Sequence, residues 1–283
     1  MFVGSNTVAA SFQYVMDGIA PLYEEREASN IARLYFEDKF GLSRAELVLK
    51  AEEKFSESEL LQIHQDLKRL KTKEPVQYVT GKASFCGLEL SVDNHVLIPR
   101  PETEELVAWI LSLNSRRFPT ILDICTGSGC IALALKVNLP EAIVHASDIS
   151  KEAIEIARKN AVSLSAGIEL HVADILEGEP EISGLDILVA NPPYIATEES
   201  SKLEDNVRKF EPHIALFSND PLTFYRTIAG YGVSMLKEDG ELFLEIHEQY
   251  SLEVKEILEI EGYKRIDVKE DLQGRPRMVR AMR

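Results

Sequence analysis

The strongest constraint in this sequence is an alternation of apolar runs and helical stretches after Pro101. Five runs have the length of a β-strand: TILDI, IVHASDI, IELHVAD, LDILVAN and ELFLEIH. Helical stretches such as CIALALKVNL and SKEAIEIARKNAV lie between most of them. Strands that alternate with helices form a mainly parallel sheet with helices on both faces. The sequence therefore predicts an α/β domain.

The end of the chain departs from this alternation. YKRIDVKED and PRMVRAMR are two strand-like runs joined by LQGR, with no helix between them. Two such runs form a hairpin, and the hairpin is predicted to place one antiparallel strand in the sheet.

The chain before the α/β domain is predicted to be helical. SNIARLYFEDKF, SRAELVLKAEEKF and SESELLQIHQDLKRL each carry apolar residues at three-and-four spacing. Ser43 and Ser56 are each followed after three residues by a glutamate, Glu46 and Glu59, which is the capping-box spacing. We expect a helical bundle at 1–74, a β-hairpin linker at 75–97 and the α/β domain at 98–283.

Composition and charge narrow the possible partners and the compartment. The formal net charge is −16, which argues against a protein that grips nucleic acid phosphates over a wide surface, although a local basic patch remains possible. The N-terminus lacks a basic segment before a long apolar run, and no stretch approaches the ~18 apolar residues of a membrane span. We expect a cytoplasmic protein with no membrane partner.

The cysteine and histidine patterns predict neither a disulfide nor a metal site. Cys86, Cys125 and Cys130 are odd in number and form no CxxC pair, which fits a reducing compartment. The six histidines show no paired ligand spacing.

The run ILDICTGSGC indicates a nucleoside-binding turn. Gly127, Gly129 and Ala132 form GxGxxA after the first strand, and Asp148 ends the next strand, where it can bind ribose hydroxyls. Asp123 places a carboxylate close to where a phosphate would lie. This favours S-adenosylmethionine, which is cationic at sulfur and has no phosphate. Asp174 ends the third strand and is placed near the adenine, or alternatively serves as a helix N-cap or a solvated strand end.

The stretch VANPPYIA raises a second question about the same edge. Pro192 and Pro193 stop the fourth strand because neither donates a backbone N–H, and Asn191 and Tyr194 flank them. Read alone, the stretch could be a simple turn. Because carboxyl ends of parallel strands meet at one rim, however, the glycine turn, Asp148 and this stretch converge there. That convergence favours a functional loop.

Taken together, TGSG, SDIS and NPPY resemble class I methyltransferases that methylate amino or amide nitrogens. The segments EPVQYVTGKASFCGLELSVDNHVLIPRPETE, IPRPETEELV, ANPPYI, EPHIAL and DLQGRPRMV resemble the HemK/PrmC family of protein-(glutamine-N5) methyltransferases, over about residues 74–283. The resemblance implies a Rossmann-like fold and S-adenosylmethionine as methyl donor, with S-adenosylhomocysteine as product. It also implies a protein substrate, the GGQ glutamine of class-1 peptide chain release factors, and no direct nucleic acid partner.

The resemblance also implies roles for individual residues. The Asn191 side-chain oxygen and the Pro192 backbone oxygen would each accept one N–H of the substrate amide, Pro193 would stiffen the loop, and the Tyr194 ring would pack on the amide plane. The expected cofactor-binding residues are Cys125, Thr126, Gly127, Ser128, Gly129, Asp148, Asp174, Ile175 and Asn191. The loop 100–103 is expected to position cofactor and substrate, although Thr103 is also a plausible helix N-cap.

Three positions depart from the family pattern. Cys125 stands where the family has glycine, and it is small enough for cofactor binding provided that its φ is negative. His247 replaces a glycine, and we expect it to be a buried or capping histidine. Ile175 stands where some members carry an aromatic residue, and it can still pack on the adenine.

Two other functions compete with this interpretation. An N6-adenine or guanine-N2 nucleic acid methyltransferase would share the NPPY loop, but it needs a flipped base and phosphate contacts, which the charge of −16 disfavours. A binding module that retains the fold without catalysis is disfavoured by the intact loop from Asn191 to Tyr194.

Overall fold

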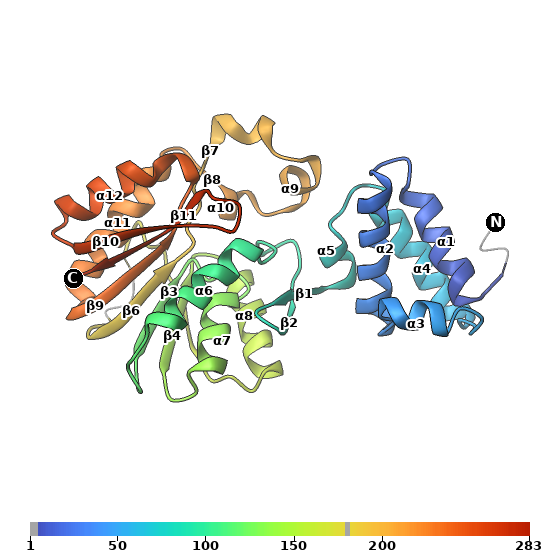
Figure 1. Cartoon of the computed structure of the whole chain (residues 1–283), viewed down its shortest axis with the longest axis horizontal. Helices are drawn as coiled ribbons and strands as arrows, with labels where there is room; N and C mark the ends of the chain where they lie inside the picture. The colour runs from blue at the N-terminus through green and yellow to red at the C-terminus, as the bar shows by residue number, and fades with distance from the viewer. Residues whose placement is uncertain (1–4, 179–181) are drawn as a thin grey trace. The chain divides into compact units, whose positions relative to one another are not determined.

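The computed structural model describes residues 5–178 and 182–283. The chain divides into two compact units (Figure 1). One comprises the chain up to Lys82 together with Glu204–Phe210, and the other comprises Ala83–Leu203 and Glu211–Arg283. Within the described ranges, no helix is long and apolar enough to cross a membrane.

The first unit is helical, as the sequence predicts. Its helices are α1 (Val8–Ile19), α2 (Glu25–Phe40), α3 (Arg44–Leu49), α4 (Glu57–Leu70), α5 (Val76–Thr80) and α9 (Asp205–Phe210). Their apolar faces bury a core that includes Val15, Tyr35, Phe36 and Ile63. Ser43 and Ser56 form the predicted capping boxes at the starts of α3 and α4.

A hairpin of β1 (Lys82–Phe85) and β2 (Leu88–Ser91) precedes the larger unit's sheet. Its turn residues Cys86 and Gly87 have φ of 49° and 75°, the positive values that a two-residue primed turn requires. The buried Asn160 exchanges hydrogen bonds with the backbone of Ser91 at 2.7 and 3.0 Å. Its amide also donates to the Ser128 carbonyl at 2.9 Å, so one side chain ties the hairpin to the glycine turn.

The larger unit contains a seven-stranded sheet in the order β10-β11-β9-β6-β3-β4-β5. The strands are β3 (Thr120–Ile124), β4 (Ile143–Asp148), β5 (Glu169–Val172), β6 (Leu185–Ala190), β9 (Leu236–Glu245), β10 (Lys264–Glu270) and β11 (Pro276–Met282). β5, β4, β3, β6 and β9 are parallel, and β11 pairs antiparallel with both β9 and β10. The five predicted strands and the antiparallel C-terminal hairpin are confirmed.

Helices cover both faces of this sheet, as Figure 1 shows. On one face, α6 (Pro101–Leu113), α7 (Cys130–Asn138) and α8 (Lys151–Ser163) pack against side chains such as Ile121 and Val144. On the other, α11 (Pro221–Met235) and α12 (Ser251–Ile260) pack against alternate residues such as Leu122 and Leu188. Because side chains alternate between the faces of a strand, fully apolar strands serve both cores.

Between β6 and α11 the chain makes an excursion that the sequence reading did not describe. It contains β7 (Ile195–Ala196), η1 (Thr197–Lys202), α9, α10 (His213–Leu216) and β8 (Phe217–Ser218), and β7 pairs parallel with β8. A short 3-10 helix, η2 (Glu248–Tyr250), follows β9. The excursion begins at the NPPY loop, and its α9 belongs to the helical unit.

Candidate active site

The turn after β3 has an unusual backbone. Cys125, Gly127 and Gly129 have φ of 59°, 54° and 81°, values that side chains rarely adopt. A Cβ at Gly129 would lie 3.1 Å from the Cβ of Ala157, so helix packing also requires glycine there. A Cβ at Gly127 would meet nothing within 4 Å, which leaves its backbone open to a ligand.

Cys125 does not meet the condition that the sequence reading attached to it. A negative φ was required, and the φ is +59°. A left-handed conformation costs an L-residue with a Cβ about 1–2 kcal/mol. Cys125 nevertheless lines the cavity described below, so the turn forms at the cost of local strain.

Asp123, in β3, holds the glycine turn in place through hydrogen bonds. Its Oδ2 accepts from Thr126 Oγ1 at 2.6 Å and from Ala132 N at 3.2 Å. The carboxyl is fully buried, and burial raises its pKa to about 7. Its Oδ1 has no hydrogen-bond partner among the described residues. The carboxyl thus holds the start of α7 against the end of β3 and retains one unused acceptor.

Asp148 and Asp174 follow β4 and β5 to the same edge. Asp148 accepts from the backbone N–H groups of Gly127 and Ser150, both at 2.9 Å. Burial is the largest cause acting on its pKa, which is raised. Asp174 Oδ1 accepts from the Leu176 N–H at 2.9 Å, so Asp174 stabilises its own turn. It is not a helix N-cap, because no helix begins in residues 175–178.

A cavity of about 220 Å³ opens beside these residues. Its lining includes most of the predicted cofactor residues, namely Cys125, Thr126, Gly127, Ser128, Asp148, Asp174, Ile175 and Asn191. Gly129 is not part of the lining and acts through the shape of the turn. Pro193 also lines the cavity, as do Ile214, Ala215 and Phe224, which the sequence reading did not assign.

A chain of hydrogen bonds fixes the side chain of Asn191. Thr103 Oγ1 donates to Glu245 Oε2 at 2.6 Å, and Asn191 Nδ2 donates to Thr103 Oγ1 at 3.3 Å. Because the single hydroxyl proton of Thr103 is donated to Glu245, the Thr103 oxygen must act as the acceptor toward the Asn191 amide group. The amide NH₂ therefore faces Thr103, and Asn191 Oδ1 faces away from it.

The same carboxylate holds the aromatic residue of the loop. Tyr194 OH donates to Glu245 Oε1 at 3.1 Å. Burial raises the pKa of Tyr194, so the hydroxyl keeps its proton. Glu245 is itself fully buried, and the sequence analysis does not single it out because the run ELFLEIH predicts only a strand. A carboxylate inside an otherwise apolar strand was the available signal, because buried acids need partners.

In the loop 100–103, the helix cap is a different residue from the Thr103 that the sequence suggests. Thr103 is not the N-cap of α6, because the helix begins at Pro101 and Arg100 is the cap. Arg100 also pairs with the buried Glu211 at 2.5 Å, and Glu211 accepts from the Ile98 N–H at 3.2 Å. The segment EPHIAL thus secures the loop that carries Thr103.

One further expectation is confirmed. His247 caps η2, with Nδ1 accepting from the Gln249 N–H at 3.2 Å. Within the described residues, Cys86, Cys125 and Cys130 are not joined in a disulfide.

The arrangement defines a class of enzyme. A glycine turn after β3, acids after β4 and β5, an Asn-Pro-Pro-Tyr loop after β6 and an antiparallel β11 beside β9 are the features of a class I methyltransferase. The chain also matches family models for a methyltransferase small domain, at residues 105–208, and for a PrmC N-terminal domain, at residues 18–81.

Curated relatives narrow the class. A release factor glutamine methyltransferase of Flavobacterium psychrophilum is 40% identical, over 94% of this chain and 95% of that relative. The enzyme of that name from Bacteroides thetaiotaomicron is 38% identical, over 95% of this chain and 98% of the relative. The chain belongs to the family of release factor glutamine methyltransferases.

Solved structures agree on the fold. A methyltransferase from Pyrococcus furiosus superposes with a TM-score of 0.53 at 17% identity, over 80% of this chain and 98% of the other. The hMettl16 catalytic domain superposes with a TM-score of 0.54 at 18% identity, over 81% of this chain and 82% of the other. At such identities the likeness extends to the fold alone.

Proposed function

We propose that this enzyme transfers a methyl group from S-adenosylmethionine to the side-chain amide nitrogen of the GGQ glutamine in class-1 release factors. The names of its relatives support the substrate. The observation that carries the chemistry is the fixed Asn191 amide: its Nδ2 donates to Thr103, which donates to Glu245, so Oδ1 is left to accept from the substrate.

The residues at the rim fit the cofactor. Gly127 has open backbone, Asp148 and Asp174 line the cavity, and Asn191 and Pro193 of the NPPY loop line it as well. We assign the ribose to Asp148, the adenine to Asp174 and Ile175, and the methionine part to residues 125–129. When bound, S-adenosylmethionine supplies an electrophilic methyl group attached to a sulfonium.

The NPPY loop positions the nucleophile. An amide nitrogen is a weak nucleophile because its lone pair is delocalised into the carbonyl, so orientation contributes much of the rate. Asn191 Oδ1 and the Pro192 carbonyl each accept one N–H, and Tyr194 packs on the amide plane. Both oxygens stabilise the positive charge that develops on nitrogen, which afterwards loses a proton to solvent. No metal ion is needed for this step.

Methyl incorporation from a tritiated donor tests the proposed substrate. Release factor should be labelled, and the same factor with the GGQ glutamine changed to alanine should not. Labelling of that control would reject the glutamine amide as the acceptor. Labelling of tRNA, rRNA or DNA in its place would favour the nucleic acid alternative.

The helical unit supplies, in our proposal, the surface that docks the release factor in the cytoplasm. Every motif of the predicted chemistry lies after residue 97, and the PrmC N-terminal match lies within residues 18–81. A chain that begins at residue 75 should keep cofactor affinity and lose affinity for whole release factor. If the folded, truncated chain lost cofactor binding, this division of roles would be wrong.

A further inference from the structure

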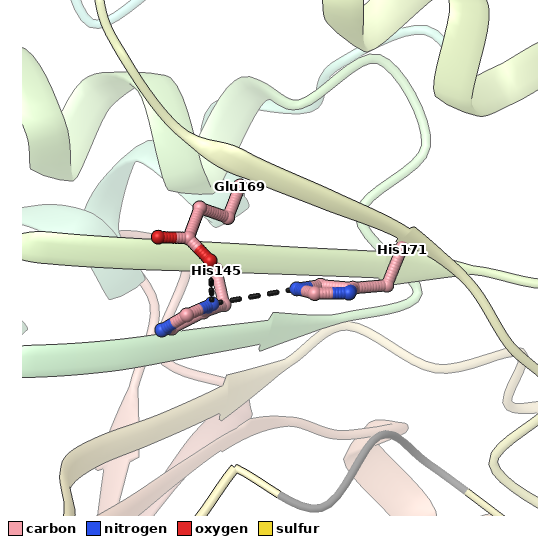
Figure 2. A group of neighbouring side chains, drawn as sticks. All are labelled: His145, Glu169 and His171. Carbon is pink, nitrogen blue, oxygen red and sulfur yellow. Dashed lines mark hydrogen bonds and ion pairs between the residues drawn. The ribbon is translucent and has the colours of Figure 1, made fainter.

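His145, Glu169 and His171 gather at the edge of the sheet, and none of them is assigned to the reaction. β4 and β5 are parallel neighbours, and His145 lies directly opposite Glu169 in their register. Glu169 and His171 are two residues apart on β5, so all three side chains lie on one face of the two strands. Figure 2 shows the three side chains pointing toward one another from these strands.

The face of β4 and β5 that carries the cluster is the one opposite the helix-covered face. Val144, Ala146 and Leu170 alternate with the cluster and pack into the core that α7 shares with β4. Helices therefore cover the opposite face. Between β5 and β6, no helix is found in the described residues 173–178 and 182–184. The His145 side chain is 11% exposed and that of Glu169 is 65% exposed. The cluster is therefore buried at His145 and reaches solvent at Glu169.

The distances fit a metal ion better than a set of hydrogen bonds. His145 Nδ1 lies 3.3 Å from Glu169 Oε2 and 3.3 Å from His171 Nε2, and all three ligand atoms lie within 4.8 Å of one another. A neutral imidazole has at most one hydrogen on Nδ1, which can be directed well at only one of those partners. Ligands about 2.0–2.1 Å from a tetrahedral ion stand about 3.3 Å apart, so one ion would satisfy both contacts.

We propose that His145, Glu169 and His171 form a binding site for a divalent transition-metal ion of the zinc type. Two imidazole nitrogens and one carboxylate oxygen suit zinc, whereas magnesium and calcium prefer oxygen ligands alone. Three protein ligands leave a fourth position for water. The ion would tie the edge strand β5 to β4, the two strands that lead to Asp174 and Asp148.

Metal binding to the full-length chain tests this site. Apo protein should bind one equivalent of Zn²⁺ in calorimetric titration. Co²⁺ should give visible d–d absorption typical of a four-coordinate site. Glu169→Gln and His171→Gln, which alter exposed or half-exposed side chains, should each weaken Zn²⁺ binding by about tenfold to hundredfold or more, since even partners of metal ligands contribute on that scale. At a hundredfold excess over Kd, Zn²⁺ should raise the melting temperature of wild type by about 5–10 °C.

His95→Gln is the matched control. His95 Nδ1 lies 2.9 Å from Asp93 Oδ1, and among the described residues this pair is not part of a group of three potential ligands, so the change should leave Zn²⁺ affinity as it was. The proposal is overturned if wild type shows no saturable Zn²⁺ binding, or if the two cluster variants bind as tightly as wild type. A thiolate-to-cobalt charge-transfer band would place the ion on a cysteine and would equally overturn it.

Discussion

The two halves of the active rim are held in different ways. In the cofactor half, Asp123 accepts from Thr126 and Ala132, 3 and 9 positions away, Asp148 accepts from Gly127, 21 positions away, and Asn160 donates to Ser128, 32 positions away. In the NPPY half, Asn191 is held by a residue 88 positions away and Tyr194 by one 51 positions away. The first half depends on contacts within the consecutive segments from β3 to α8, and the second depends on how α6 and β9 pack.

This difference separates binding from chemistry. Contacts among consecutive segments fix the cofactor turn once β3, α7, β4 and α8 are in place. The acceptor geometry of Asn191 depends on the buried carboxylate of Glu245 on another strand. Changes at the turn should therefore alter cofactor affinity, and changes in the network should alter turnover.

Asn191→Ala should have the largest effect. Loss of one preorganised acceptor for the reacting amide should lower turnover by ~10²-fold or more, the scale seen for a single transition-state partner. Methyl incorporation into intact release factor measures this, with calorimetry expected to show nearly unchanged cofactor affinity. Full activity of the alanine variant would show that the NPPY loop is a structural turn without a catalytic role.

Asn191→Asp sharpens the same test. It keeps an acceptor oxygen and adds a negative charge near the sulfonium. It should retain more activity than alanine, or bind the cofactor more tightly while transfer slows. An aspartate variant less active than alanine, with unimproved cofactor binding, would contradict the acceptor role of this side chain.

Much of the candidate active site could be predicted from the sequence, because most of its motifs are short and continuous. TGSG, Asp148 and NPPY each occupy a few consecutive residues, and the rule that parallel strands end at one edge brings them together. Thr103 and Glu245 could not be paired, because nothing local in RPET or LEIH indicates a contact across 142 positions. The cluster of His145, Glu169 and His171 escaped for a related reason, since strand register, and no spacing motif, aligns β4 with β5.

Asp148→Ala should weaken cofactor binding by about 1–3 kcal/mol, or roughly 5- to 150-fold in Kd, because charged hydrogen bonds to ribose are lost. Asp148→Asn keeps an acceptor for one of the Gly127 and Ser150 N–H groups, which bond to different carboxylate oxygens, so it should lose less than alanine does. Calorimetric titration of folded variants measures both. Unchanged affinity in the alanine variant would remove Asp148 from the cofactor site.

Glu245→Gln should lower turnover by about tenfold, with cofactor affinity retained. Glutamine offers one acceptor oxygen in place of two, so either Thr103 or Tyr194 loses its partner, at a cost of about 1.5 kcal/mol. Glu241→Gln is the matched control, because Glu241 is a buried glutamate of the same strand that pairs with Arg280. Equal loss of turnover in both variants would attribute the effect to the packing of β9 and not to the network.

Cys125→Gly should have the smallest effect, and its sign is informative. Glycine relieves the left-handed strain at φ +59°, about 1–2 kcal/mol, but its freer unfolded chain offsets about 0.5–1 kcal/mol of that gain. The net expectation is a stabilisation of up to about 1.5 kcal/mol, measured as a higher urea midpoint with an unchanged m-value. Cys125→Ala removes the thiol and keeps the Cβ, so it should bring no such gain. If alanine stabilised as much as glycine, the thiol and not the backbone would be the source of the cost, and the turn would carry no strain at this position.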